Sequence, residues 1–224
     1  MVSLIDADIL PYSVCFKGMK EGWSYDKLKE VIDEWFIAIV TGCNTTQYIA
    51  YLSGDNNFRS RIYPEYKANR KQPKPDYFYE LRRYLRERWK CVTIDGAEAD
   101  DALAMSQVKL DFMSAICSTD KDLKQIPGYH YNIKEHYLST IGIEEAYRNL
   151  WMQVLTGDST DNIKGISRIG PKKAAEIVDN VLFTTVPEAV RRMYNDDDEF
   201  ILNYRLVSLI QENSNFHLPK IREL

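Results

Sequence analysis

Acidic residues follow each of the first four predicted strands of this chain. Apolar runs predict the strands at residues 2–6, 47–52, 91–94 and 114–118. The acidic residues at or just beyond their ends are Asp6, Asp8, Asp55, Glu98, Asp100, Asp101, Asp120 and Asp122. In an open parallel sheet, ligands bind in the crevice outside the carboxyl ends of the strands, so we expect these side chains to converge there. Asp158 and Asp161, three residues apart, add a pair that a helix would place on one face.

So many carboxylates in one crevice would repel each other, and a cation is needed to neutralise them. Lys121 and Lys124 are the basic residues that lie within these acidic motifs. Ligation by oxygen alone, without Cys or His, suits Mg²⁺ or Mn²⁺ better than Zn²⁺. Two such ions about 4 Å apart form the two-metal arrangement that assists in-line displacement at phosphorus.

Each acidic motif taken alone has an ordinary structural interpretation. A lone Asp-x-Asp is most often a loop or helix cap, EADD can be a charged helix start, and TDKD and GDSTDN can be capped turns. These interpretations do not explain why the motifs occur at successive strand ends. The joint placement therefore favours a metal site.

A second pattern is GISRIGPKKAAEIV, residues 165–178. Gly165 and Gly170 bracket a turn, and Pro171 opens a helix at its first position. Such a hairpin exposes backbone N–H groups at a helix N-terminus, which is a potential anion site. Lys172 and Lys173 oppose the helix dipole there, unless a phosphate is bound. The alternative is an ordinary helix–turn–helix connection.

The basic residues are concentrated in one segment. Residues 59–90 contain eleven Lys and Arg and four acidic residues, a net charge of +7, which leaves −11 for the rest of a chain whose net charge is −4. Within it, YPEYKANRK interleaves Tyr66 with Lys67 and Arg70, and we expect Tyr66 and Arg70 to share a helical face. Stacking on a base and gripping a phosphate require such residues. A solvated charged helix is the alternative interpretation.

Predicted strands alternate with helices over the first part of the chain. Helices are expected at residues 24–42, 75–89 and 98–110, and a fifth strand at 129–133, which indicates a mostly parallel sheet covered by helices on both faces. From residue 143 onward we expect no strand and a small helical unit, with helices at 143–157, 171–181, 187–194 and 197–211. The predicted domains are thus an α/β core at 1–142 and a helical region at 143–224.

Composition excludes several classes of protein. With 224 residues, 45% apolar and 28% charged, the chain is neither disordered nor fibrous, and its apolar runs are too short to span a membrane. The N-terminus does not read as a secretory signal. The four Cys are widely spaced and do not pair with the three His at zinc spacing, so we expect a reduced, cytoplasmic protein without structural zinc.

These motifs together resemble the structure-specific 5′ nucleases, a family that includes flap endonucleases, phage 5′–3′ exonucleases and the 5′-nuclease domain of DNA polymerase I. The stretches that carry the resemblance are LIDAD, SGD, PEYKANR, AEADD, STDKDLKQIPG and TGDSTDNIKGISRIGPKKA. They occur in the family's order between residues 4 and about 178. Together they are specific, although none is specific alone.

The resemblance implies roles for individual residues. It assigns Asp6, Asp55, Glu98 and Asp100 to one metal ion and Asp120, Asp122, Asp158 and Asp161 to a second, with Asp101 between them. It places Lys67, Arg70, Asp6 and Asp101 in catalysis. It makes Tyr66, Lys67 and Arg70 the base of a helical arch, expected at residues 56–77, through which a 5′ strand threads. Residues 165–173 resemble a helix–three-turn–helix that holds duplex DNA, with a K⁺ ion in the 165–170 hairpin.

The implied function is Mg²⁺-dependent hydrolysis of phosphodiester bonds at 5′ ends, nicks or flaps of DNA, in replication or repair. We expect Mn²⁺ to substitute, RNA–DNA hybrids to be a candidate substrate, and the protein to act as a monomer away from membranes. One alternative is a PIN-type RNA nuclease, which would lack GISRIGPKKA. The other is a non-catalytic binder of branched DNA with the same fold, which would lack some of the carboxylates.

Overall fold

A central sheet organises the first two thirds of the protein. The computed structural model describes residues 1–213 and 215–224. The main strands are β1 (Val2–Asp6), β2 (Gln47–Asn57), β3 (Val92–Gly96), β4 (Ser114–Ser118), β5 (Gly128–Asn132) and β6 (Tyr137–Ile141). They lie in the order β3-β2-β1-β4-β5-β6, parallel except for β6, and β9 (Arg222–Glu223) pairs antiparallel with the start of β2.

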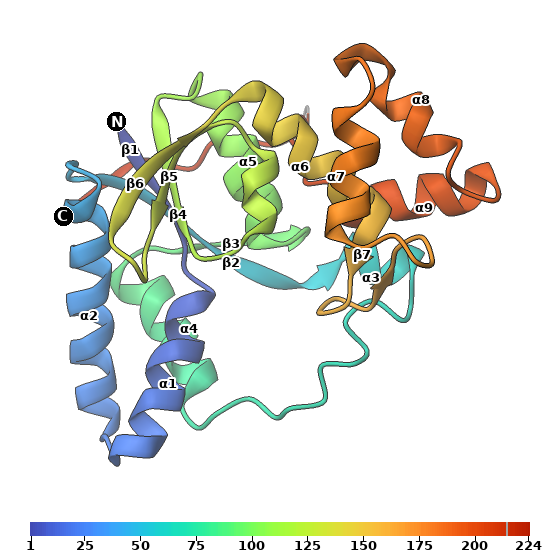
Figure 1. Ribbon diagram of the computed structural model, residues 1–224. Helices are drawn as coiled ribbons and strands as arrows, with labels where there is room; N and C mark the ends of the chain where they lie inside the picture. Colours follow the sequence, from blue (N-terminus) through green and yellow to red (C-terminus); the bar gives the residue numbers. More distant parts are fainter. Residues whose placement is uncertain (214) are drawn as a thin grey trace.

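Helices cover both faces of this sheet (Figure 1). α1 (Ile9–Glu21), α2 (Tyr25–Gly42) and α4 (Phe78–Arg88) pack on one face, and α5 (Ala99–Lys109) packs on the other. β1 shows why both faces can be covered. All its residues are buried, and because successive side chains point to opposite faces, Ile5 joins the core under α1 and α2 while Leu4 joins the core under α5.

The topology places a crevice at the end of β1. In the sheet, β1 lies between β2 and β4. The chain continues from β1 to β2 on one side, and it reaches β4 on the other side only after β3 and α5. Strand order reverses at this point, and open α/β sheets bind ligands there. Asp6 ends β1 at that position.

The second part of the chain is mainly helical and forms its own hydrophobic core. Its elements are α6 (Ile143–Thr156), β7 (Gly157–Asp158), β8 (Ile163–Lys164), α7 (Pro171–Asp179), η2 (Phe183–Thr185), α8 (Val186–Arg191) and α9 (Asp197–Val207). Val154, Ala174, Val190 and Leu206 are among the buried residues of that core. Figure 1 shows α7, α8 and α9 at one end of the sheet, joined to it by α6.

The structure contains elements that were not predicted from the sequence, and it contradicts two expectations about the second part of the chain. Residues 9–21 form α1, which Pro11 and Gly18 conceal in the sequence because both lower helix propensity. Residues 137–141 form β6, and short strands β7, β8 and β9 occur after residue 143, where none was expected. The last helix ends at Val207, not at residue 211.

The helical arch expected at residues 56–77 is also absent. Residues 58–62 form the short helix α3 (Phe58–Ile62), and residues 63–77 contain turns and extended chain. We call residues 63–77 the strap, which crosses from α3 and β7 to α4 in Figure 1. Lys67 has a φ of +57°, and Pro64, Pro73 and Pro75 interrupt the segment, so Tyr66 and Arg70 do not share a helical face. Among the described residues, no helix is both long and apolar enough to cross a membrane.

Candidate active site

A cleft of about 1050 Å³ opens where the parallel strands end. Carboxylates line one part of it: Asp6, Asp8, Asp55, Glu98, Asp100, Asp120, Asp122, Asp158 and Asp161. Basic and aromatic side chains also line it: Tyr12, Arg59, Tyr66, Lys67, Arg70, Lys74, Phe78, Tyr79, Arg82, Arg86 and Lys121. None of the described lining residues is a His or a Cys. The cleft therefore combines an acidic surface with a basic and aromatic one.

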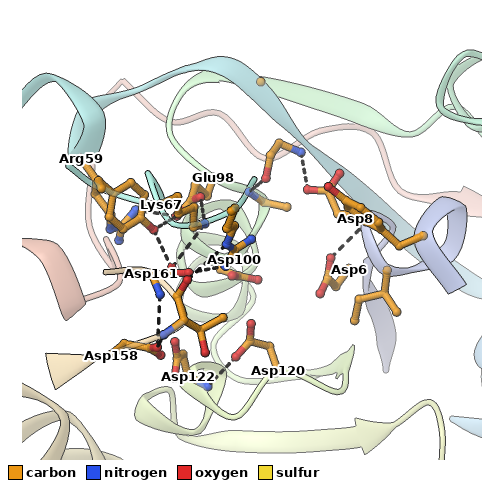
Figure 2. Close-up of a pocket in the computed structure, with 18 of the residues that line it drawn as sticks. Asp6, Asp8, Arg59, Lys67, Glu98, Asp100, Asp120, Asp122, Asp158 and Asp161 are labelled. Atoms are coloured by element: carbon orange, nitrogen blue, oxygen red, sulfur yellow. Dashed lines mark hydrogen bonds and ion pairs between the residues drawn. The ribbon is translucent and has the colours of Figure 1, made fainter. Parts of the chain in front are cut away.

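The acidic side chains come from separate elements and point toward a common space (Figure 2). Asp6 is fixed at the end of β1, where its carboxylate accepts hydrogen bonds from the Ser118 hydroxyl at 2.8 Å and the Asp8 N–H at 3.2 Å. Asp100 lies in the first turn of α5. After β4, the Asp120 carboxylate accepts the N–H of Asp122 at 2.9 Å. Asp55 lies within β2 and is exposed on the cleft.

Three of these carboxyl groups have raised pKa values. Burial, with the charges of Asp8 and Asp120, raises the pKa of Asp6 to about 7. Burial and the charges of Asp6 and Asp120 raise the pKa of Asp100 well above its ordinary value. Burial and Asp120 likewise raise the pKa of Asp122 to about 7. Their negative charges face one another without enough compensation.

Asp158 belongs to the same wall but is stabilised in its ionised form. Burial opposes ionisation, yet the N–H groups of Thr160 and Asp161 and the charge of Lys121 outweigh it and lower the pKa of Asp158. The Thr160 N–H donates to the Asp158 carboxylate at 2.6 Å. This loop therefore presents a carboxylate that stays charged at neutral pH.

The strap is fastened to the loop that carries Asp161. The Lys67 N–H donates to the Asp161 carbonyl at 2.9 Å, and the Asn69 amide donates to the Ser159 carbonyl at 2.7 Å. In the opposite direction, the Asn162 amide donates to the carbonyl of Glu65 at 2.8 Å. These bonds hold the PEYKANR and GDSTDN motifs together, although 90 or more residues separate the bonded pairs.

Lys67 and Arg70 extend from the strap into the acidic part of the cleft. The Lys67 ammonium pairs with Glu98 and, at 3.4 Å, with Asp161, and the Arg70 guanidinium pairs with Asp161. Lys67 is partly exposed, whereas half of the Arg70 side chain is exposed. Both residues can therefore approach a phosphate that enters the cleft. Arg82 similarly pairs with Asp8.

Two assignments from the sequence are wrong in this structure. Asp101 does not line the cleft, because it is fully buried and both its oxygens bind the Arg59 guanidinium, at 2.7 and 2.9 Å. It is therefore a structural partner of Arg59, not a metal ligand or catalytic residue. Tyr66 is only 6% exposed and its hydroxyl lies 2.7 Å from a Glu98 oxygen, so its ring is not free to stack on a base.

Arg59, which also lines the cleft, is one of the site residues that sequence reasoning missed. Its position in a basic segment suggested a surface charge, but the side chain is 1% exposed and forms a salt bridge with Asp101. A buried Arg cannot be told from an exposed one by composition. The apolar Phe58 and Ile62 around it were the available hint that this short helix packs inward.

The residues predicted to hold duplex DNA lie outside the cleft. Gly170 caps the N-terminus of α7, Pro171 is at its first position, and Lys172 and Lys173 are exposed in its first turn. Gly165 has a packing role, because a Cβ there would lie 2.1 Å from the carbonyl carbon of Thr156. Residues 166–169 thus form a turn before α7, and Lys172 and Lys173 make no ion pair within the described residues.

The donor set of the cleft fits a hard divalent cation. Among residues 1–213 and 215–224, no three Asp, Glu, His or Cys side chains are arranged to hold a metal ion as they stand. Lys67, Arg70, Arg82 and Lys121 instead neutralise four of the carboxylates. Asp6, Asp55, Asp100, Asp120 and Asp122 have no ion-pair partner among the described residues, so negative charge remains in excess. Oxygen ligands with excess negative charge are what Mg²⁺ and Mn²⁺ require.

Comparison with known proteins agrees with this geometry. Residues 2–150 match the family model of the 5′-3′ exonuclease, N-terminal resolvase-like domain. Flap endonuclease Xni of Shewanella sp. (strain ANA-3) is 31% identical over 72% of this chain and 71% of its own length. DNA polymerase I of Rhizobium leguminosarum is 33% identical over 54% of this chain, which spans only 14% of that protein.

Solved structures share the fold at lower identity. The T5 5′-exonuclease with bound divalent metal ions superposes with a TM-score of 0.73, at 19% identity, over 93% of this chain and 89% of that one. The catalytic core of Rad2 in complex with DNA substrate superposes with a TM-score of 0.58, at 14% identity, over 94% and 79%. The family match, residues 2–150, covers strands β1 to β6 and the first part of α6. The chain thus belongs to the 5′–3′ exonuclease and flap endonuclease family, the structure-specific 5′ nucleases that its motifs resemble.

Proposed function

We propose that this protein is a divalent-metal-dependent nuclease that hydrolyses phosphodiester bonds at 5′ ends and flaps of DNA. The observation that carries the proposal is the cleft itself. Its acidic wall lies at the carboxyl ends of the strands, and a basic strap crosses beside it. The acids suit metal ions that act on phosphate, and the basic residues suit the nucleic acid backbone.

The metal-holding residues in this proposal are Asp6, Asp100, Asp120, Asp122 and Asp158, with Glu98, Asp161 and Asp55 at the margins. Their carboxylates line the same cleft. A bound Mg²⁺ or Mn²⁺ supplies Lewis-acid activation of phosphate and water. The T5 5′-exonuclease holds zinc ions in a related fold, which supports a divalent metal ion as the class of cofactor. We propose Mg²⁺ as the physiological ion because the ligands are all oxygen.

Lys67 and Arg70 have different proposed roles. Lys67 lies among the acids, since its ammonium pairs with Glu98, so it can stabilise negative charge that develops on the scissile phosphate. Arg70 is more exposed, and its guanidinium fork suits a grip on the backbone of the incoming strand. The aromatic rings of Tyr12, Phe78 and Tyr79 on the same wall provide the apolar surface that Tyr66 does not.

The hairpin at residues 165–173 is proposed to hold duplex DNA beside the cleft. Two exposed lysines flank a helix N-terminus, where backbone N–H groups favour a phosphate. A K⁺ ion in the hairpin remains part of the proposal. Duplex with a nick, a flap or a free 5′ end is the proposed substrate, with RNA–DNA hybrid as a second form and the monomer as the active species. The bacteriophage T5 flap endonuclease has been captured with DNA and metal ions, which supports DNA as the partner.

The test is cleavage of a 5′-labelled flap, a nicked duplex and an RNA–DNA hybrid, each with Mg²⁺, Mn²⁺ or EDTA. We expect metal-dependent cleavage by the wild-type protein, loss of cleavage in Asp120→Asn, and full activity in Asp26→Asn. Asp26 is a suitable control because it is an exposed carboxylate on α2, away from the cleft. Failure of the wild-type protein to cut any substrate with either metal would refute the proposed function.

A further inference from the structure

The end of α9 and the residues just after it are held by buried side chains from three other elements. The segment is Leu206–Ile210, and the side chains are Arg59 of α3, Asp101 of α5 and Gln125 of the 3-10 helix η1 (Asp122–Gln125). All three side chains are at most 3% exposed. Buried groups with this many backbone partners fix the position of whatever carries them.

Arg59 connects this segment to the start of α5. Its Nε donates to the Leu206 carbonyl at 2.8 Å and its Nη2 to the Ser208 carbonyl at 2.9 Å. The same guanidinium binds both oxygens of Asp101, and Nη1 lies 3.4 Å from a Glu98 oxygen. Asp101 in turn accepts the N–H of Glu98 and that of Ile210, each at 3.0 Å. The turn that presents Glu98 and Asp100 is thereby tied to residues 206–210.

Gln125 makes the equivalent connection for the acids after β4. Its amide nitrogen donates to the Val207 carbonyl at 2.9 Å, and its amide oxygen accepts the Leu209 N–H at 3.0 Å. The amide nitrogen also donates to Gln153 at 2.9 Å, and Gln153 lines the cleft. Gln125 ends η1, whose first residue is Asp122. The loop that presents Asp120 and Asp122 is thus tied to the same backbone.

We infer that Arg59 and Gln125 are positioning residues, which hold the two groups of metal-binding carboxylates at a fixed separation by anchoring both to residues 206–210. Gln125 does not line the cleft, and Arg59 lines it with only 1% of the residue exposed, so we assign both to positioning and not to contact with substrate. The inference rests on the proposed function, because it concerns the carboxylates that would hold the metal ions. The helical unit would then contribute to the site in two ways. It supplies Asp158 and Asp161 to the cleft, and the end of α9 anchors the residues that position the other carboxylates.

The chemistry of the two side chains explains why close substitutes would fail. Arg59 uses donors on all three guanidinium nitrogens in a fixed fork, and a Lys has neither the fork nor enough reach to several acceptors at once. Gln125 uses both ends of its amide, so a Met of similar size fills the space but leaves the Val207 carbonyl and the Leu209 N–H unsatisfied.

The experiment measures Mn²⁺ affinity by titration calorimetry on the full chain, together with the melting temperature. Partners behind a metal's direct ligands typically change metal affinity by about 10–100-fold when they are lost. We expect Arg59→Lys and Gln125→Met each to raise the Kd for Mn²⁺ by about 10-fold or more. If Arg59→Lys fails to fold, the Mn²⁺ affinity of Gln125→Met alone tests the inference.

Two controls separate positioning from loss of stability. Arg148→Met removes another two-pronged Arg–Asp pair, with Asp179, on the surface of the helical unit. Leu85→Ala destabilises the core under α4, on the opposite face of the sheet from α5. Both should leave Mn²⁺ affinity unchanged. The inference is overturned if Arg59→Lys and Gln125→Met lower the melting temperature as Leu85→Ala does while Mn²⁺ affinity stays within about two-fold of wild type.

The same measurements distinguish this inference from the proposed function. A wild-type protein that neither binds Mn²⁺ nor cleaves DNA would remove the proposed function and the inference with it. A wild-type protein that does both, with variants of unchanged affinity, would remove the inference alone.

Discussion

At the scale of single residues, the cleft contains carboxylates in two electrostatic states. Glu98 and Asp161 are paired with Lys67 and Arg70, whereas burial raises the pKa of Asp6 to about 7. The acids at or near the ends of β1, β2, β3 and β4 could be predicted from the sequence. Asp158 and Asp161 were expected to share a helix face, but Asp158 lies in β7 and Asp161 in the turn after it. The partners of the acids could not be predicted, because Arg59 and Tyr66 are buried by packing between segments that lie far apart in the chain.

Substitution of Lys67 should chiefly affect the rate of cleavage, and substitution of Arg70 should chiefly affect the affinity for DNA. We expect Lys67→Ala to lower the single-turnover rate by about 100-fold, the cost typical of losing one preorganised transition-state donor, with little change in Kd. Arg70→Ala should chiefly raise Kd, since half of the side chain is exposed in the cleft, where the DNA strand is proposed to enter. Single-turnover cleavage at saturating protein measures the first effect and binding in EDTA the second. Small and equal effects would mean that the strap is only an electrostatic guide.

Asp100→Asn should stabilise the metal-free protein and inactivate it. Burial and neighbouring carboxylates disfavour the charged form of Asp100, which raises its pKa. Removing that charge should raise the melting temperature in EDTA by about 2–4 °C, the shift that roughly 1 kcal/mol produces in a protein of this size. Asp158→Asn is the matched control and should lower it, because the Asp158 carboxylate is stabilised by two N–H groups. A lower melting temperature for Asp100→Asn would show that Asp100 is a structural partner.

At the scale of elements, regular patterns were predictable and irregular segments were not. The long helices α2 and α6 have an apolar face with helical periodicity, and Ser24 and Asp196 cap α2 and α9 through their side chains. α3 is only five residues long and β6 is largely exposed, so neither has a distinct pattern. The strap is shaped by its prolines and by bonds to residues 159–162, which local sequence does not encode.

The hairpin before α7 should contribute to DNA affinity through its two lysines. Lys172→Ala combined with Lys173→Ala should weaken binding of every duplex substrate, whatever its sequence. It should also reduce the slope of log affinity against log salt by about 1 for each lysine that contacts a phosphate. Fluorescence anisotropy in EDTA at several salt concentrations measures both. Lys27→Ala with Lys29→Ala, on exposed α2, should leave the slope unchanged; an equal change in the two double variants would exclude the hairpin.

At the scale of the whole molecule, three segments far apart in the sequence meet around one cleft. The sheet supplies Asp6, the strap supplies Lys67, and the helical unit supplies Asp158 and Asp161. Asn69, Asn162 and Arg59 hold these segments together. The charge separation seen in the sequence, +7 in residues 59–90 against −11 elsewhere, is partly brought together here, because six basic residues of that segment and nine carboxylates from outside it line the same cleft.

The whole protein should lose stability with rising pH when no metal is bound. Asp6 and Asp122 have pKa values of about 7 in the folded state, against an ordinary 3.8. The folded state therefore holds more protons between these values, and its stability falls as the pH rises toward and through 7. In EDTA the melting temperature should decrease from about pH 6 to about pH 8, and Mg²⁺ should flatten the decrease. A melting temperature that rises over this range in EDTA would contradict the assignment.

The most direct test of the central claim compares two flaps of opposite polarity. A duplex with a single-stranded 5′ flap and the same duplex with a 3′ flap are each incubated with the wild-type protein and Mg²⁺, under single-turnover conditions. We predict that the 5′ flap is removed, with a 5′-phosphate on the trimmed strand, and that the 3′ flap stays intact. Equal cleavage of the two flaps, or none of the 5′ flap, would contradict the account of this cleft as the active site of a 5′ nuclease.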